Sequence, residues 1–244
     1  MSRAPRISII IPTRNEEQAI TSLLRSLSRQ DRIDDCQVIV VDGNSSDDTA
    51  ELASAFPFVQ VLSTTPGLVP QMNFGAQMAN AEILWFVHAD TTLPNRATID
   101  SIVQAMADPE VVGGACRFHL RGDDLYFKFV NSLVNLRARV LGRPYGDQGI
   151  FARTAAFRKI GGFRPLSSCA DIDFVMRLRR EGSIRVVPAR VETSARTWHR
   201  YGKITTTVWH LKEWLAFEWD RLFRSGKASD LQVQPLQEPT KKTS

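Results

Sequence analysis

The chain has 244 residues, of which 43% are hydrophobic, and a formal net charge of +5, a composition typical of a folded globular protein. Its three cysteines are widely spaced and form no Cys-x-x-Cys motif, which argues against a disulfide framework or a zinc site and fits a reducing cytosol. No stretch approaches the ~18 apolar residues of a membrane-spanning helix, and no nucleic-acid-binding motif is found. We therefore expect a cytoplasmic protein, soluble or peripheral at the inner face of the membrane, that binds no nucleic acid.

Strand and helix signals alternate through the first half of the chain. Four short apolar runs are typical of buried strands, and they lie at residues 7–11, 38–41, 59–62 and 83–87. Helical periodicity and helix-start residues between them predict helices at residues 15–27, 47–56, 70–80 and 94–107. This alternation indicates parallel βαβ units, and the uniformly apolar strands indicate a sheet that is covered on both faces.

The second half of the chain is less regular. Its pattern predicts a strand at residues 111–120, helices at residues 123–141 and 171–181, and edge strands at residues 185–187 and 190–195. A further short strand is expected directly after Gly146-Asp147-Gln148. A long amphipathic helix is expected at residues 204–223. Residues 225–244 are polar and contain two prolines, so we predict a disordered tail there.

The predicted C-terminal helix is apolar on more than one side. One stripe consists of Ile204, Val208, Leu211, Leu215, Trp219 and Leu222. Three further aromatic side chains lie largely off that stripe, namely Trp209, Trp214 and Phe217. Such a helix packs in a core or a homodimer, or lies in a membrane interface, where Trp is favoured. The sequence leaves membrane-surface contact and a homodimer through residues 204–223 both open.

Polar clusters follow three of the predicted strands, at the point where each strand ends. The clusters are Pro12-Thr13-Arg14-Asn15-Glu16, Asp42-Gly43-Asn44-Ser45-Ser46-Asp47 and His88-Ala89-Asp90. In open α/β sheets ligands bind beyond the carboxyl ends of the strands, so the clusters predict one site. Asp90 suits Mg²⁺ or Mn²⁺, which prefer carboxylate oxygen; the alternative is a turn or helix-capping aspartate. His88 is a ligand of the nucleotide or the metal, or a structural residue.

A candidate general base lies in the second half. Residues 151–203 hold twelve Lys and Arg against four Asp and Glu, which fits an anionic ligand such as a diphosphate, an anionic membrane surface or a solvated basic surface. Asp171 lies in this segment, which favours its ionised form, and an ionised carboxylate can act as a general base. The alternative is a helix cap, and Asp147 and Asp173 are rival bases. Asp42 can accept from a ribose or a base, or cap the next helix.

The combination of these motifs resembles the family-2 glycosyltransferases of the GT-A fold. The resemblance covers roughly residues 6–200, and the pairing of His-Ala-Asp with Gly-Asp-Gln looks most like a bacterial subgroup labelled arsenosugar-biosynthesis glycosyltransferases. The segments that carry it are residues 9–17, 40–47, 88–90, 146–151 and 161–163, together with Asp171 and the helix after it.

The resemblance implies a fold and a reaction. The fold is α/β, a central, mostly parallel sheet of the nucleotide-diphospho-sugar transferase type, flanked by helices. One domain would span residues 1–224, with a nucleotide-binding half at 6–110, an acceptor half at 111–203 and the C-terminal helix at 204–223. The reaction is metal-dependent, inverting hexosyl transfer from a nucleotide-diphosphate sugar, with a UDP-sugar favoured, to the hydroxyl of an unknown acceptor. The cofactor would be Mg²⁺ or Mn²⁺.

The resemblance also implies roles for single residues. Asp171 is the catalytic base, Asp90 binds the metal, and Asp42 contacts the nucleotide base. The remaining donor-binding residues are Pro12, Thr13, Asn15, Glu16, Asn44, His88, Gln148 and Arg196. His199 lies in the same C-terminal segment as Arg196 and could approach the metal.

The chain departs from the family pattern at several positions. His88 replaces the first acid of the usual Asp-x-Asp, and Ala170 replaces the glutamate before the catalytic aspartate. Leu68 and Met72 replace basic residues of the donor region, and Arg196 is displaced by one position from the family's Arg-Trp signature. These departures motivate an alternative, a non-catalytic sugar-nucleotide-binding or scaffold protein on the same fold. A dinucleotide-binding oxidoreductase is disfavoured, because no Gly-x-Gly-x-x-Gly follows the first strand.

Overall fold

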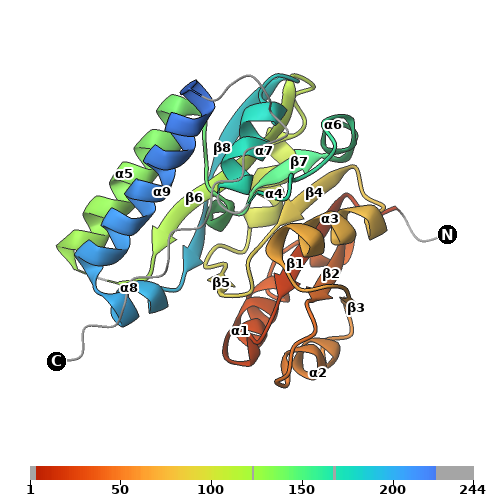
Figure 1. Cartoon of the computed structure of the whole chain (residues 1–244). Coiled ribbons are helices and arrows are strands. Elements are labelled where there is room, and N and C mark those ends of the chain that lie inside the picture. Colours follow the sequence, from red (N-terminus) through yellow and green to blue (C-terminus); the bar gives the residue numbers. More distant parts are fainter. Residues whose placement is uncertain (1–3, 123, 167–168, 224–244) are drawn as a thin grey trace.

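The computed structural model describes residues 4–122, 124–166 and 169–223 (Figure 1). Within them one sheet of eight strands has the order β3-β2-β1-β4-β7-β6-β8-β5. The strands are β1 (Ile7–Thr13), β2 (Cys36–Asp42), β3 (Val59–Ser63), β4 (Ile83–Phe86), β5 (Thr91–Thr92), β6 (Val111–Leu120), β7 (Phe151–Arg153) and β8 (Ser183–Thr193). The α-helices are α1 (Glu17–Leu27), α2 (Thr49–Ser54), α3 (Leu68–Met78), α4 (Thr98–Ala105), α5 (Leu125–Leu141), α6 (Thr154–Lys159), α7 (Ala170–Leu178), α8 (Arg196–Tyr201) and α9 (Lys203–Phe223). Two short 3-10 turns are η1 (Ile33–Asp35) and η2 (Gly146–Gln148).

The first half of the sheet follows the predicted βαβ pattern. β1 pairs in parallel with β2 and with β4, and β2 pairs in parallel with β3. The four predicted strands are confirmed to within about two residues at their ends, which is the usual accuracy of such boundaries. Because the strands are parallel, their carboxyl ends lie at the same edge of the sheet.

The second half makes the sheet mixed rather than parallel throughout. β7 pairs antiparallel with both β4 and β6, β5 pairs antiparallel with β8, and β6 pairs in parallel with β8. Gly113 and Gly114 allow this close packing in β6. A Cβ on Gly113 would lie 2.5 Å from the carbonyl oxygen of Phe151, and one on Gly114 would lie 2.0 Å from that of Arg185. Glycine is therefore required where β6 meets β7 and β8.

The prediction of two edge strands around Pro188 is wrong. A single strand, β8, runs through Pro188 and lies between β6 and β5. The register shifts there, since Ala115 pairs with Val186 but Arg117 pairs with Arg190. Pro188 lies at this irregularity, where its missing N–H does not interrupt the ladder of hydrogen bonds.

Two hydrophobic cores cover the two faces of the sheet. One core gathers residues of α1, α2 and α4 against alternate residues of β1 and β2, such as Ile9 and Val40. The other gathers residues of α3, α6 and α7 against the intervening positions, such as Ile10 and Ile39. This explains why the strands read as uniformly apolar: both faces of each strand are buried.

A third, smaller core joins α5 to the sheet. Phe127 and Val130 of α5 pack against Phe118 and Leu120 of β6. The helix begins at a capping residue, Asp124, whose carboxylate accepts a hydrogen bond from the backbone N–H of Phe127. α5 and α9 lie side by side, at the side of the molecule farthest from α2 and β3 (Figure 1).

Most predicted helices are confirmed, with differences at their ends. The helix expected at residues 94–107 begins only at Thr98, and the short helices α6 and α8 were not predicted. The predicted tail at residues 225–244 lies outside the described residues. Across the described ranges, no helix combines the length and apolar character needed to cross a bilayer.

Candidate functional site

The polar segments after β1, β2 and β4 meet at one edge of the sheet. Thr13 at the end of β1 is opposite Asp42 at the end of β2, and Ile10 is opposite Phe86, two residues before His88. Pro12 and Thr13 are buried in the last residues of β1. The structure thus brings the three predicted clusters together in the position where open α/β sheets bind ligands.

Hydrogen bonds tie the loops after β1 and β2 to each other. The side-chain oxygen of Asn15 accepts from the backbone N–H of Ser46 (2.8 Å), and the backbone N–H of Asn15 donates to Ser45 Oγ (3.0 Å). The carboxylate of Asp42 accepts from the backbone N–H of Ser45 (3.0 Å) and from its hydroxyl. Asn15 and Asn44 have φ angles of 54° and 57°, which asparagine tolerates. Asn15 and Asp42 therefore shape these loops.

Gln71 of α3 is a buried residue of this region that the sequence analysis missed. Its Nε2 donates to the carbonyl oxygens of Thr13 and Val41, both at 2.7 Å. Its Oε1 accepts from the backbone N–H of Gly67 at 3.3 Å. Gln71 therefore fixes the ends of β1 and β2 to the start of α3. A polar residue on the apolar side of a predicted helix was the available signal.

His88 and Asp90 lie in the turn between β4 and β5, and both are half-buried. The turn is closed by a hydrogen bond from the backbone N–H of Thr91 to the carbonyl oxygen of His88 (3.1 Å). Within the described part of the chain, the Asp90 carboxylate makes no hydrogen bond or ion pair, so it caps no helix there. Its charge contributes to the raised pKa values of Glu16 and Asp147.

Glu16 and Arg196 join the two ends of the chain at this site. The Nη2 of Arg196 lies 3.1 Å from both carboxylate oxygens of Glu16, although the residues are 180 positions apart. The backbone N–H of Glu16 donates to Thr49 Oγ1 at 2.8 Å. Burial raises the pKa of Glu16, and the charge of Arg196 and its hydrogen bond oppose that shift. Arg196 begins α8, so this short helix brings a cation to the loop after β1.

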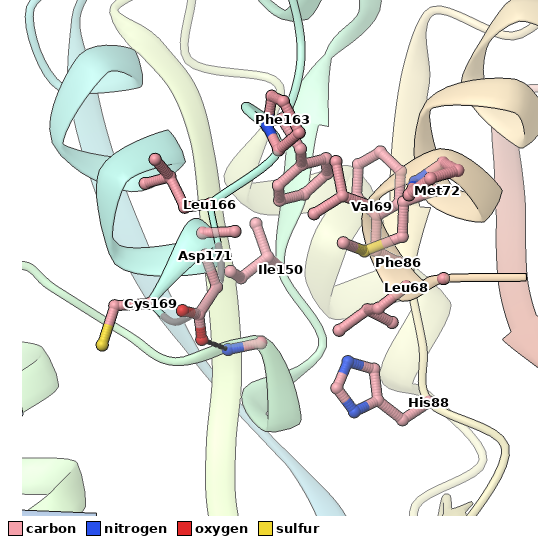
Figure 2. A pocket seen from close by; sticks show the side chains of 15 residues that line it. Leu68, Val69, Met72, Phe86, His88, Ile150, Phe163, Leu166, Cys169 and Asp171 are labelled. Carbon is pink, nitrogen blue, oxygen red and sulfur yellow. Dashed lines mark hydrogen bonds between the residues drawn. The ribbon is translucent and has the colours of Figure 1, made fainter. Parts of the chain in front are cut away.

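Asp171 lies in the first turn of α7 and faces the same space as His88 (Figure 2). Its Oδ2 accepts from the backbone N–H of Gly146 at 2.6 Å, and its Oδ1 accepts from that of Ile172 at 2.8 Å. A Cβ on Gly146 would lie 3.3 Å from Asp171 Oδ2 and 3.4 Å from His88 Nε2. The Gly146 backbone thus holds Asp171 in place while leaving the space beside His88 open.

Asp147 and Arg137 lie next to Asp171. The Oδ1 of Asp147 is buried without a hydrogen-bond partner. Burial, followed by the charge of Asp171, raises the pKa of Asp147 to about 7; Arg137 opposes the shift and Asp90 adds to it. The guanidinium carbon of Arg137 lies 3.4 Å from the centre of the Tyr145 ring, and its Nε and Nη2 are buried without hydrogen bonds. Neither Arg137 nor Tyr145 was predicted from the sequence.

A cavity of about 520 Å³ opens between α3 and α7, and most of its wall is apolar (Figure 2). Leu68, Val69 and Met72 approach it from α3, while Leu166 and Asp171 face it from the other side. The remaining lining residues are Gly67, Pro70, Phe86, His88, Gly146, Ile150, Phe163, Pro165, Cys169 and Ala170. Asp171 and His88 are the charged or titratable oxygen and nitrogen side chains among these lining residues, so chemistry at Asp171 would take place beside an apolar wall.

Three residues that the sequence suggested for the site have other surroundings in the structure. Gln148 is completely buried, and its amide bonds to the backbone of Cys116 (3.2 Å) and Tyr145, so it lies behind the site rather than in it. Asp173, a rival base, is buried in an ion pair with Arg177 at 2.7 Å. His199 is exposed, and its ring lies edge-on to Phe127 of α5, 6.1 Å between centres.

The acids at the sheet edge fit a hard divalent cation. Asp90 is unpaired among the described residues, Asp147 has a buried oxygen without a partner, and the negative charges of Asp90 and Asp171 raise the pKa of Asp147. A cation would relieve this repulsion. Within the described ranges, no cluster of three or more His, Cys, Asp or Glu side chains forms a ready-made metal centre. Mg²⁺ typically binds through one or two carboxylates together with substrate phosphates, and Asp90 suits that arrangement.

Relatives of known class resemble this chain in sequence. The 4,4'-diaponeurosporenoate glycosyltransferase of Staphylococcus haemolyticus is 35% identical over 114 residues, which cover 44% of this chain and 30% of the relative. A PGL/p-HBAD biosynthesis glycosyltransferase of Mycobacterium tuberculosis (strain H37Ra) is 25% identical over 220 residues, which cover 84% of this chain and 81% of the relative. The chain thus spans under a third of the first relative and most of the second.

Solved structures share the fold. The mannosyltransferase PcManGT from Pyrobaculum calidifontis, in complex with GDP-Man and Mn²⁺, has a TM-score of 0.72 at 22% identity, covering 93% of this chain and 66% of that one. TarS 1-349 of S. aureus, in complex with UDP-GlcNAc, has a TM-score of 0.64 at 23% identity, covering 78% and 58%. The predicted α/β fold of the GT-A type is confirmed. The sequence model described as glycosyl transferase family 2 matches residues 8–185, and the chain therefore belongs to that family.

Proposed function

We propose that the protein transfers a sugar from a nucleotide-diphosphate sugar to an acceptor hydroxyl, with inversion at the anomeric carbon and with Mg²⁺ or Mn²⁺. The observation that carries this proposal is the position of Asp171. Its carboxylate is fixed by the Gly146 N–H at 2.6 Å and lines a cavity with His88, beside the strand-end acids. A carboxylate held between a donor region and a cavity is what direct transfer to a hydroxyl needs.

The donor would occupy the edge formed by β1, β2 and β4, in the half at residues 6–110. Backbone and side-chain polar groups of Pro12, Thr13, Asn15 and Asn44 surround this edge, and Asp42 is suited to accept from a ribose or a uracil. Glu16 orients Arg196, whose guanidinium retains donors that can meet a diphosphate oxygen. A UDP-sugar and transfer of a hexosyl group stay our expectation for the donor. The bacterial subgroup named above also stays a prediction.

Asp171 would act as the base of the transfer. Its Oδ2 accepts from the backbone N–H of Gly146 and its Oδ1 from that of Ile172, so the carboxylate is held in one orientation in the first turn of α7. The acceptor hydroxyl gives its proton to Asp171 as its oxygen attacks the anomeric carbon. The bond from that carbon to the diphosphate breaks on the opposite face, which inverts the configuration. The negative charge then rests on the departing diphosphate, near Arg196 and the side of the site where Asp90 lies.

Asp90 would hold the divalent cation, with His88 beside it. When bound, the cation supplies positive charge that stabilises the leaving diphosphate. Asp147 lies close enough for its pKa to respond to Asp90, and its unpartnered Oδ1 is available to the same cluster. PcManGT, which shares the fold, is described in complex with Mn²⁺ and GDP-Man, and this supports the choice of ion.

The acceptor would enter through the half at residues 111–203. The cavity beside Asp171 is lined mainly by apolar side chains, including Leu68 and Met72 at positions where the resemblance led us to expect basic residues. An acceptor with an apolar group next to its reacting hydroxyl fits this wall better than a highly charged one. Ala170 also lines the cavity, so the missing glutamate leaves room there rather than a second carboxylate.

The donor proposal is tested by thermal unfolding with UDP, GDP, dTDP, ADP and CDP, each with and without Mn²⁺. A ligand that binds only the folded state raises stability by RT ln(1 + [L]/Kd), so about 100-fold excess over Kd gives nearly 3 kcal/mol. We expect one nucleotide to raise Tm only with the cation, and Asp90→Ala to abolish that rise. If no nucleotide raises Tm with or without Mn²⁺, the donor site is degenerate and the proposal fails.

The catalytic proposal is tested by Asp171→Asn. The amide keeps an oxygen for the Gly146 N–H but cannot take the proton, so turnover should fall by roughly 10²–10⁴-fold while nucleotide binding persists. Release of nucleoside diphosphate measures turnover, and the thermal shift measures binding. Full turnover in this variant would remove Asp171 from the mechanism. Nucleotide binding by the wild type without any turnover, over a broad acceptor panel, would favour the scaffold alternative.

A further inference from the structure

Exposed apolar side chains are concentrated on two helices. Of the thirteen large apolar side chains that are exposed in the described part of the chain, eleven lie on α5 and α9. Ten of them recur every three or four residues on each helix, and Leu141 directly follows Val140. Leu125 of α5 is 83% exposed and Ile204 of α9 is 74% exposed. Contiguous exposed apolar surface of this kind marks an interaction site more often than scattered single residues do.

The two apolar stripes lie on the same side of the helix pair. α5 and α9 run side by side in the same direction (Figure 1). At one end Tyr126 Oη donates to the carbonyl oxygen of Lys203 (2.8 Å), and at the other Arg143 pairs with Glu218 (2.6 Å). At about 100° per residue, each stripe is centred roughly 50–60° around its helix from Tyr126 or Glu218 and lies opposite the buried residues of that helix. The stripes therefore form one outward surface, the α5–α9 face.

A positively charged groove borders the α5–α9 face. It has a volume of about 800 Å³ and lies between α5 and the strands β6 and β8. Four cations line it: Arg117, Lys128, Arg139 and Arg190. No Asp or Glu lines it, and none of the four cations forms an ion pair within the described ranges. Leu136 and Val140 belong both to the groove wall and to the apolar stripe of α5, so the charged and apolar surfaces are continuous.

We infer that the α5–α9 face docks the protein on a membrane surface that carries anionic lipids. The apolar stripes would enter the boundary between head groups and acyl chains, as amphipathic helices parallel to a bilayer do. The cations of the groove would meet lipid phosphates at the edge of the buried stripe. The groove carries charge of a single sign, which complements an anionic surface. In a symmetric dimer through this face, the unpaired positive charges of the two copies would lie on both sides of the interface and repel each other. This inference does not depend on the proposed glycosyl transfer.

The test is co-sedimentation of the whole protein with vesicles of neutral phosphatidylcholine or with about 30% phosphatidylglycerol added, at low and high salt. We expect binding to the anionic vesicles to be at least about tenfold tighter, and to weaken about tenfold in 0.5 M salt because charges are screened. Lys128→Glu with Arg139→Glu should reduce this binding at least about tenfold. The matched control, Arg29→Glu with Arg158→Glu, makes the same charge change on exposed residues of other elements and should bind like wild type.

Apolar contact is tested separately by Leu133→Gln with Leu211→Gln, one residue from each stripe. This variant should also lose at least about tenfold in binding, whereas Met78→Gln, at an exposed apolar residue of α3, should not. Thermal unfolding of each variant shows that it is folded. Absence of binding to anionic vesicles, or equal binding by all variants, overturns the inference. The inference is also overturned if the protein binds no vesicles and light scattering shows a dimer that Leu133→Gln with Leu211→Gln dissociates. The α5–α9 face would then join two copies of the chain.

Discussion

Asp147→Asn is expected to stabilise the protein in a strongly pH-dependent way. The Asp147 carboxyl has a buried oxygen without a partner, next to the charges of Asp171 and Asp90. Burial is the largest cause of its raised pKa, and the nearby Arg137 offsets only part of the effect. The folded state therefore holds this proton more tightly than the unfolded chain does. Asparagine has a similar shape and carries no charge at any pH.

The size of the effect follows from the two pKa values. The pKa rises from its ordinary value of 3.8 to about 7 in the folded protein. Below pH about 4 the group is protonated in both states and has no effect on stability. As pH rises from about 4 to about 7, the unfolded state loses the proton first, so the free energy of unfolding falls. Three pKa units correspond to about 4 kcal/mol, fully expressed above pH about 7.

Thermal unfolding from pH 4 to pH 8, in the presence of EDTA, measures this difference. Asp147→Asn and wild type should differ little at pH 4, and the variant should be more stable at pH 8 by up to about 4 kcal/mol, or about 8–16 °C in Tm for a chain of this length. Asp34→Asn, at an exposed aspartate, is the control and should follow wild type throughout. A Tm difference between Asp147→Asn and wild type that is the same at every pH would refute the reasoning.

Three further changes test the core and the donor side. Phe174→Ala removes a fully buried ring stacked 4.2 Å from Phe163 and should lower the free energy of unfolding by about 3–5 kcal/mol; a urea midpoint close to wild type would contradict this. Gln71→Ala removes one donor from each of two strand-end carbonyls, so urea unfolding should show a loss of about 1–3 kcal/mol, with weaker nucleotide binding. Arg196→Ala breaks a half-exposed pair with Glu16, so stability should change by under about 1 kcal/mol, whereas the KM for the donor should rise several-fold; an unchanged KM would separate Arg196 from donor binding.

The elements that could be predicted are those marked by a pattern of neighbouring residues in the sequence. Apolar runs such as Ile7–Thr13 and Cys36–Asp42 mark buried strands because both of their faces are covered. The alternation with helices then requires parallel pairing, and parallel pairing gathers Thr13, Asp42 and His88 at one edge. The donor side of the site could therefore be read from residue types and their order along the chain.

The second half of the chain was harder to predict, because its structure depends on contacts that no local pattern encodes. The short strand expected after Gly146-Asp147-Gln148 is confirmed as β7, but its position between β4 and β6 and its reversed direction do not show in the periodicity. Pro188 reads as a strand breaker but lies at an irregularity of β8, where the ladder tolerates it. Gln148 belongs to the Gly-Asp-Gln motif, but its side-chain amide donates to the backbone carbonyl of Cys116 inside the fold.

Sequence alone determined the fold class, the order of the first strands, and the acids that face the sheet edge, because burial and strand direction follow from neighbouring residues. Only the tertiary structure decided how those acids are surrounded. It joins Arg196 to Glu16, sets Arg137 against Tyr145, and holds Asp171 against the Gly146 backbone. The first and last of these contacts link positions 180 and 25 residues apart. The energy of all three depends on three-dimensional distance and burial, which a linear pattern does not contain.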